Sequence, residues 1–342
     1  IFIQSKDQTT ENTEVTERGE RSIDSFSQEN CILRVLCELR GEKIEYIHNK
    51  KDGIYKHKQH YIASCIALFA GYKECVHAMK VLVIMGSPRK GNTYRAVRKI
   101  EEVMRSKGEV EFEYLMLKDV NLSHCCGCFS CFEKGEEHCP FKDDAPLIEQ
   151  KMHDADGVIF ATPVYGMGVS AQMKTFIDRL SYIFHRPRFF DKKALLLSTA
   201  GASGLKDILD HLQVVAGIWG FEVVQRVGII ASPIPRSKKK ELAEEQKLRK
   251  AAVIFYDALL KKGRRSPGFR EVMIFRAQKT SFGELAESLP ADHAYWKEQG
   301  WLKPQAKYYV DVPVNPLYNA IGWTAEQVLR RKIRKEMREA QK

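Results

Sequence analysis

Three absences narrow the class of protein before any motif is considered. The 342-residue chain has no apolar run near the roughly 20 residues that a helix needs to cross a bilayer. Its first 20 residues are polar and lack the apolar segment of a secretory signal. No strand-like segment is followed by GxGxxG, the fingerprint of dinucleotide-binding folds. These absences disfavour an integral membrane protein, a secreted protein and a dinucleotide pyrophosphate fold, and they predict a cytoplasmic location.

A lysine is missing where a triphosphate-binding loop would need one. Gly86–Thr93 reads GSPRKGNT, which matches GxxxxGKT except that Asn92 stands where the lysine that reaches the terminal phosphates should be. Nucleoside triphosphate chemistry is therefore disfavoured. A monophosphate remains, and the phosphate of flavin mononucleotide (FMN) is the best candidate.

The same stretch has the order strand, small polar turn, helix. The apolar run Val81–Met85 breaks at Gly86, and an amphipathic segment begins at Asn92. Such a junction gathers free backbone N–H groups at the positive end of a helix dipole, which favours anions. The alternative is an ordinary strand–helix turn with exposed polar residues. The predicted phosphate-binding residues are Ser87, Arg89, Lys90, Gly91, Asn92 and Thr93.

Downstream of Lys80, apolar runs alternate with helical patterns. Five runs are predicted as strands: Val81–Met85, Phe112–Leu117, Gly157–Ala161, Ala194–Ser198 and Val223–Ile230. With crossover helices between them, they form a doubly wound parallel α/β sheet, most simply in the order 2-1-3-4-5. Ligands bind such sheets at the switch point, so the loops after strands one, three and four should line a flavin site.

Two of these loops are rich in small residues. Proline and glycine keep the first loop non-helical and let its backbone approach a flat ring, and a tyrosine there could stack on the ring. The alternatives are a surface loop with a packed tyrosine and, for the second loop, any tight strand–helix connection. The predicted ring-binding residues are Pro163, Val164, Tyr165 and Gly166 in the first loop and Thr199 and Gly201 in the second.

Five of the nine cysteines crowd into the loop 125–139 after the second strand. Cys125, Cys128, Cys131 and Cys139 have the spacing C-x2-C-x2-C-x7-C, in which three thiolates can wrap one face of a 4Fe–4S cluster and a fourth completes it. Cys126 could replace Cys125. The alternatives are a reduced, metal-free loop packed over the flavin and a zinc site, which more often uses two separated C-x2-C pairs.

Charged residues near this loop receive structural roles. Asp143 and Asp144 are predicted to cap the helix that follows them. Lys174, Asp178 and Arg179 have the spacing of a helix-surface ion pair, with interface contacts as the second interpretation.

Three motifs together resemble a known family over residues 79–232. GSPRKGNT, CCGCFSCFEKGEEHCPFKDD and TPVYGMGVSAQMKTFIDR are similar to motifs of the NAD(P)H-dependent FMN reductases, which are flavodoxin-like, and within them to the iron–sulfur flavoproteins. The resemblance implies a homodimer or homotetramer supplied with electrons by reduced ferredoxin or a nicotinamide. It assigns the FMN phosphate to Ser87, Arg89, Asn92 and Thr93, the flavin ring to Pro163, Tyr165 and Gly166, and the cluster to Cys125, Cys128, Cys131 and Cys139.

The chain is predicted to have three parts: an N-terminal appendage (1–78), the flavodoxin-like domain (79–235) and a mostly helical extension (236–342). We expect Met79 to begin the folded unit. The extension holds 24 Lys and Arg against 13 Asp and Glu, whereas the first 235 residues hold 31 of each. Helices are expected over 236–265 and 325–341, with an irregular aromatic segment after Pro267.

The favoured interpretation of the extension is a subdomain that packs on the core and keeps a solvated basic face. The alternatives are docking of an acidic electron carrier and peripheral contact with an anionic membrane. Nucleic acid is not expected, because no recognition motif accompanies the charge.

Taken together, the sequence predicts an FMN-dependent oxidoreductase with a 4Fe–4S cluster that moves electrons between ferredoxin or NAD(P)H and a small acceptor. The flavin carries the chemistry, so no catalytic side chain is assigned. The alternatives are a cluster-free NAD(P)H-dependent FMN, quinone or nitro reductase, and a non-enzymatic electron carrier or redox sensor.

Overall fold

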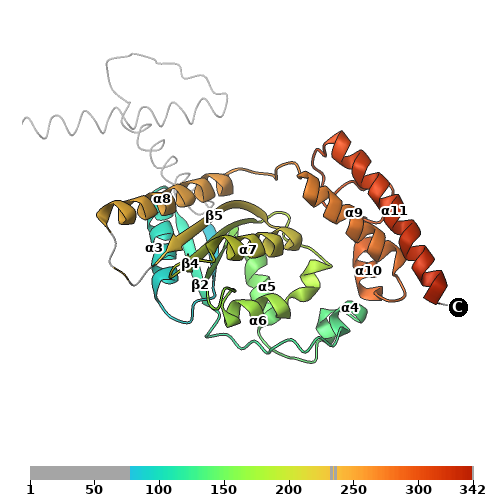
Figure 1. The fold of residues 1–342 in the computed structure, drawn as a ribbon, viewed down its shortest axis with the longest axis horizontal. Helices are drawn as coiled ribbons and strands as arrows, with labels where there is room; N and C mark the ends of the chain where they lie inside the picture. Colours follow the sequence, from blue (N-terminus) through green and yellow to red (C-terminus); the bar gives the residue numbers. More distant parts are fainter. Residues whose placement is uncertain (1–77, 232–233, 235–236, 341–342) are drawn as a thin grey trace, which may run out of the picture. The chain divides into compact units, whose positions relative to one another are not determined.

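The computed structural model describes residues 78–231, 234 and 237–340, which belong to one compact unit spanning His77–Lys342 (Figure 1). The predicted appendage, residues 1–78, lies outside the described residues except for Ala78. The idea that the folded unit begins at Met79 stays a prediction, although Met79 is the first residue of strand β1 (Met79–Met85).

A five-stranded parallel sheet forms the centre of this unit, with the strand order β2-β1-β3-β4-β5. The central strands β1, β3 and β4 are buried on both faces, which is why they are nearly continuous apolar runs, whereas the edge strands β2 and β5 are partly exposed. The order and direction confirm the predicted flavodoxin-like doubly wound sheet. The strands are β1 (Met79–Met85), β2 (Val110–Met116), β3 (Gly157–Pro163), β4 (Lys193–Ala200) and β5 (Glu222–Ile230).

Helices cover both faces of the sheet. On one face lie α5 (Ala145–Asp154), α6 (Ala171–Arg179) and α7 (Leu205–Trp219), and on the other lie α3 (Asn92–Arg105) and α8 (Lys238–Leu260). Short helical turns α4 (Ser130–Glu133), η1 (Glu136–His138) and η2 (Ser181–Phe184) belong to the connections. Three layers result, with one apolar core on each side of the sheet.

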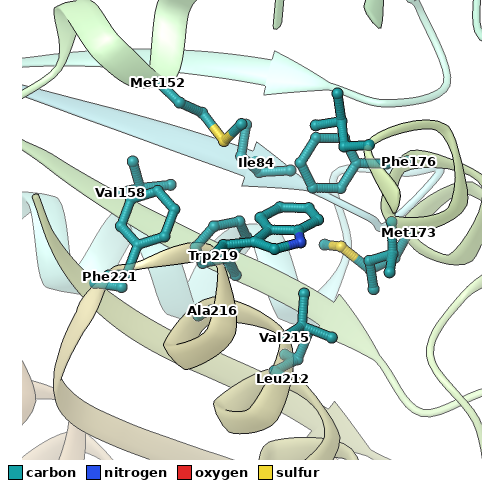
Figure 2. Packing of buried hydrophobic residues seen from close by; sticks show 14 of the residues in the cluster. Ile84, Met152, Val158, Met173, Phe176, Leu212, Val215, Ala216, Trp219 and Phe221 are labelled. Carbon is teal, nitrogen blue, oxygen red and sulfur yellow. The ribbon is translucent and has the colours of Figure 1, made fainter. Parts of the chain in front are cut away.

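The first core is centred on Trp219, at the end of α7 (Figure 2). The indole is fully buried and meets the Phe176 ring of α6 edge-on, with 5.5 Å between the ring centroids. Figure 2 shows Ile84 of β1 and Met173 of α6 beside it. Apolar residues recur every three or four positions along α7, so one stripe of the helix faces the sheet.

The second core shows that the sheet uses residues beyond the predicted domain boundary at 235. Leu248 and Phe255 of α8 are buried in it with Ile100 of α3. Gly157 at the start of β3 permits the close approach, because a Cβ atom there would come within 2.8 Å of the Phe255 ring. The first helix of the C-terminal region therefore forms part of the outer layer of the sheet.

The rest of the C-terminal region is helical, as predicted, and has its own aromatic core. Its helices are α9 (Phe269–Glu284), α10 (Pro290–Glu298) and α11 (Pro316–Ala340), with α11 packed along α9 (Figure 1). The expectation of an irregular segment after Pro267 is wrong, because α9 and α10 bury aromatic residues against one another. The buried aromatic residues are Phe275, Phe282, Trp296, Trp301 and Tyr308.

Within the described part of the chain, no helix combines the length and the apolarity needed to cross a membrane. The 25-residue α11 instead carries many charged side chains. The cytoplasmic location stays a prediction.

Candidate functional site

The predicted phosphate loop is held in shape by hydrogen bonds to one backbone carbonyl, that of Arg89. Both the Ser87 hydroxyl and the Gly91 amide donate to the Arg89 carbonyl oxygen, each at 2.8 Å. Gly86 donates to the Ala161 carbonyl at 2.8 Å, which fixes the end of β1 against β3. Ser87 is thereby buried, while the Arg89 side chain remains exposed.

Helix α3 begins at this loop with its first turn open. Its N-cap residue is Gly91, which has no side chain to accept hydrogen bonds from the first amides of the helix. The first amides of any helix have no partner within the helix, so those of Asn92, Thr93 and Tyr94 are available to an anion and lie at the positive end of the dipole. A phosphate monoester fits these donors, and the exposed Lys90 adds positive charge at the edge.

The loop after β3 contains a tight reversal. The amides and carbonyls of Tyr165 and Gly168 bond each other at 3.0 and 2.9 Å. Gly166 and Met167 between them have φ values of +54° and +61°, a conformation that glycine adopts easily and methionine rarely. The Tyr165 side chain is 45% exposed, so its ring is free to meet a ligand.

Side-chain and backbone contacts join the three loops at the carboxyl ends of β1, β3 and β4. The hydroxyls of Thr93 and Thr199 are 2.7 Å apart and buried, which joins the start of α3 to the end of β4. Val164 donates its amide to the Thr199 carbonyl at 2.8 Å. The structure therefore brings the three sets of predicted residues to one edge of the sheet, where flavodoxin-like folds bind their ligands.

Ser170 is a member of this site that the sequence interpretation missed. Its hydroxyl donates to the Gly86 carbonyl at 2.6 Å and accepts from the Met173 amide at 3.3 Å, so it caps α6 and holds the phosphate loop. A serine directly before an amphipathic helix is a recognisable N-cap signal. Its contact with Gly86, 84 residues away, has no signal in the sequence.

The remaining predicted ring-binding residues leave room for a flat ligand. At Gly166 and Gly201, an added Cβ atom would meet no heavy atom of the described chain within 4 Å, apart from their own neighbours. Pro163 is buried at the end of β3, and Val164 is half-buried. This open edge fits FMN, and the individual contacts to the cofactor stay predictions.

The five cysteines of the loop 125–139 line one cavity of about 400 Å³. They form no disulfide with one another: Cys125, Cys126 and Cys128 are exposed, and Cys131 and Cys139 are half-buried. Within the described residues, no three His, Cys, Asp or Glu side chains are arranged to hold a metal ion. The thiol donors fit an iron–sulfur cluster in chemistry and share one cavity, and holding a cluster would require these side chains to rearrange.

Burial and charge affect the thiols differently. Burial raises the pKa of the Cys131 thiol to about 11, although the nearby Arg186 acts to lower it. A hydrogen bond with Ser130 lowers the pKa of the exposed Cys128 thiol. The Cys139 sulfur accepts a hydrogen bond from the Arg179 guanidinium at 3.3 Å.

Arg179 does not take its predicted role on the helix surface. It forms a bidentate pair with Asp143 at 2.8 and 2.9 Å, and both side chains are buried, so Arg179 takes no part in a surface ion pair. The surface pair is formed by Lys174 and Asp178 alone, at 2.6 Å. Burial alone would raise the pKa of Asp143, but hydrogen bonds, first among them that from Arg179, hold it below its usual value.

Asp144 also differs from its predicted role. It is the N-cap residue of α5, yet among the described residues its side chain caps no helix amide and instead accepts from the Asn121 amide at 2.8 Å. Asp143 accepts from the Ser123 amide at 2.9 Å and, as predicted, from the Ala145 amide at the start of α5, at 3.3 Å. These two carboxylates therefore anchor the start of the cysteine-bearing connection.

Comparison with known proteins places this geometry in a family. Residues 79–235 match the family described as NADPH-dependent FMN reductase. An iron–sulfur flavoprotein of Archaeoglobus fulgidus is 32% identical over 231 residues, which are 66% of this chain and 100% of that protein. An iron–sulfur flavoprotein of Methanocaldococcus jannaschii is 46% identical over 102 residues, which are 30% of this chain and 51% of that protein.

A solved structure, that of RosB with a bound intermediate, superposes with a TM-score of 0.43 at 16% identity, over 53% of this chain and 79% of that chain. The family match spans all five strands and the three motifs. The match to the Archaeoglobus protein covers the full length of that protein. The chain therefore belongs to the NADPH-dependent FMN reductase family, a family of flavin oxidoreductases, and iron–sulfur flavoproteins are among its relatives.

Proposed function

We propose that this protein is an FMN-dependent oxidoreductase that carries a 4Fe–4S cluster in its cysteine loop. Electrons pass between ferredoxin or NAD(P)H and a small acceptor, and the active form is a homodimer or homotetramer. FMN supplies the redox chemistry, since it exchanges a hydride or single electrons.

The observation that supports the flavin most strongly is the junction of three loops at one sheet edge. The open first turn of α3 offers backbone donors for the phosphate, and the buried hydroxyls of Ser87 and Thr93 lie beside it. The loops carrying Tyr165 and Gly201 offer an exposed aromatic ring and an open backbone for the isoalloxazine. In this arrangement the protein binds and orients the cofactor, and the acceptor approaches from the exposed side.

The cluster is supported by the common cavity of the five cysteines and by the names of the relatives. Cys125, Cys128, Cys131 and Cys139 would be the ligands, and Arg179 would donate to the Cys139 sulfur. Hydrogen bonds to cluster sulfurs influence the reduction potential. The cluster would exchange single electrons with the flavin.

One observation favours a cluster-free NAD(P)H-dependent reductase as the second candidate. The thiols of Cys125, Cys126 and Cys128 are exposed, and the described residues contain no assembled metal site. In that case the loop would act as a metal-free cover beside the flavin.

The flavin assignment is tested by titrating flavin-free protein with FMN and with riboflavin. We expect FMN to bind at one per chain and riboflavin to bind at least about tenfold more weakly, because charge-assisted hydrogen bonds contribute roughly 1.5–3 kcal/mol. Equal affinity for the two flavins would contradict the phosphate site. No binding of either would contradict the proposed function.

The cluster assignment is tested by anaerobic purification with an absorption spectrum and an iron and sulfide assay. Four iron and four sulfide per chain are expected for the main proposal. Fast NAD(P)H oxidation with quinone by iron-free protein would support the second candidate. Reduction by ferredoxin alone would support the first.

A further inference from the structure

A buried carboxylate of the C-terminal region lies next to the segment that follows η2. Asp292 of α10 is fully buried, and its two oxygens are 2.6 Å from Arg186 Nη1 and 2.7 Å from His185 Nδ1. The indole of Trp296, one helical turn further along α10, donates to the His185 carbonyl at 2.7 Å. Helix α10 is thus tied to this segment by a buried ion pair and by a backbone contact.

Arg186 continues the connection into the cysteine loop. Its guanidinium is 2% exposed, and its Nη2 atom donates to the Cys131 carbonyl at 2.7 Å and to Glu136 at 2.8 Å. One planar group therefore bridges Asp292 on one side and the Cys131 turn on the other. A guanidinium is suited to this, since its donors have a fixed fork geometry that an ammonium lacks.

Stacked rings form a second connection along the same line. Phe132, the residue after Cys131, stacks on His185 with 4.2 Å between ring centroids. His185 in turn contacts Phe282 of α9 at 5.0 Å. Figure 1 shows α4, which carries Cys131, beside α10. Both connections end on the same short helix of the cysteine loop.

We propose that Asp292 is a positioning residue that acts through Arg186 to hold the turn carrying Cys131. Asp292 lies outside residues 79–235, so this role belongs to the C-terminal region and not to the segment that matches the FMN reductase family. Without the Asp292 carboxylate, Arg186 would be a buried cation with only partial compensation, and its hold on the Cys131 carbonyl would weaken. The consequence for cluster retention rests on the proposed function, whereas the positioning of Cys131 does not.

The chain offers a matched control for this ion pair. Arg276 of α9 and Glu326 of α11 form a second buried pair at 2.7 Å in the same C-terminal region. Arg276 also donates to Asn319, another residue of α11, at 2.6 Å. Asp292→Asn and Glu326→Gln therefore each remove one buried carboxylate charge, but only the first is connected to the cysteine loop.

The test measures alkylation of Cys131 by iodoacetamide in the full chain after metal removal, with mass spectrometry to separate the cysteines. Asp292→Asn and Arg186→Lys should each raise the Cys131 rate about tenfold through local opening, and Glu326→Gln should leave it within about twofold. Cys139, which is held by Arg179, should be unchanged in all of them. Both test variants keep a cation beside Cys131, so the rate reports access more than thiol ionisation.

A rise of equal size in Glu326→Gln would overturn the proposal, because general destabilisation would then explain the effect. Unchanged Cys131 rates in both Asp292→Asn and Arg186→Lys would also overturn it. If either variant fails to fold, the other decides.

Iron loss provides a readout at the cluster. In protein reconstituted with iron and sulfide, Asp292→Asn should shorten the half-life of bound iron against a chelator about tenfold relative to Glu326→Gln. A chain that binds no iron would contradict the cluster, while the alkylation contrast would still decide the role of Asp292.

Discussion

The phosphate loop and the cysteine loop are held in place in different ways. The phosphate loop is fixed by backbone groups and small hydroxyls: Ser87 and Gly91 donate to one carbonyl, and Ser170 donates to Gly86. The cysteine loop also has backbone hydrogen bonds, but these lie within α4 and η1 and join residues close together in the chain. Buried arginines from other elements, Arg179 and Arg186, connect it to the rest of the protein.

This difference has physical consequences. Neutral backbone hydrogen bonds tolerate changes in pH and salt, and each contributes about 0.5–1.5 kcal/mol. Breaking a buried ion pair by removing one partner costs roughly 3–5 kcal/mol, because an uncompensated charge remains inside the protein. The cysteine loop should therefore be the more sensitive of the two to single substitutions and to acid.

The largest effect is expected from Arg179→Met. The substitution leaves the Asp143 carboxylate buried without its cation, and we expect the free energy of unfolding to fall by about 3–5 kcal/mol. Lys174→Met, on the same helix, breaks an exposed pair with Asp178 and should cost less than about 1 kcal/mol. Urea denaturation gives the unfolding free energy of both variants. Equal losses of unfolding free energy would show that burial of the Arg179–Asp143 pair does not make it more important than the exposed pair.

An acid-dependent effect of nearly this size is expected at Glu149 of α5. Burial would raise the pKa of Glu149, but hydrogen bonds and the charge of Arg188 lower it from 4.5 to about 2. Because the folded pKa is the lower one, the stabilisation is complete above pH 4.5 and is lost as the pH falls toward 2. At pH 7 the shift corresponds to about 3 kcal/mol.

Glu149→Gln should therefore lower the unfolding free energy at pH 7, and its difference from the wild type should shrink between pH 4.5 and 2. Glu113→Gln, which breaks the half-exposed pair of Glu113 with Lys151, serves as the control and should show little of this dependence. A constant difference across this range would show that the Glu149 charge is not responsible.

The smallest of the three effects is expected in the phosphate loop. Ser87→Ala removes the buried hydroxyl that donates to the Arg89 carbonyl and shapes the turn before α3, and we expect FMN affinity to fall about tenfold and the free energy of unfolding to fall by about 0.5–1.5 kcal/mol. Ser106→Ala is a control, because Ser106 lies at the other end of α3 and its hydroxyl donates to the Val103 carbonyl. Fluorescence titration measures the FMN affinity of both variants. An equal loss of affinity in the two would contradict the assignment of Ser87 to the phosphate site.

Local patterns predicted much of the fold. The apolar runs gave strand positions to within a few residues, and the three motifs indicated which loops meet at the sheet edge. The region after Pro267 was predicted less well, since its aromatic residues lie on α9, α10 and the loops and bury one another. Burial of this kind depends on partners far apart in the chain, so short-range periodicity does not show it.

The sequence alone determined the strands, the turn after β1 and the clustering of the cysteines, because each depends on residues close together in the chain. Only the tertiary structure decided what holds the cysteine loop. Arg186 and Asp292 are 106 residues apart, and Arg179 and Asp143 are 36 apart. An exposed charge and a buried, paired charge are identical letters in a sequence, and they differ only in the surroundings that folding provides.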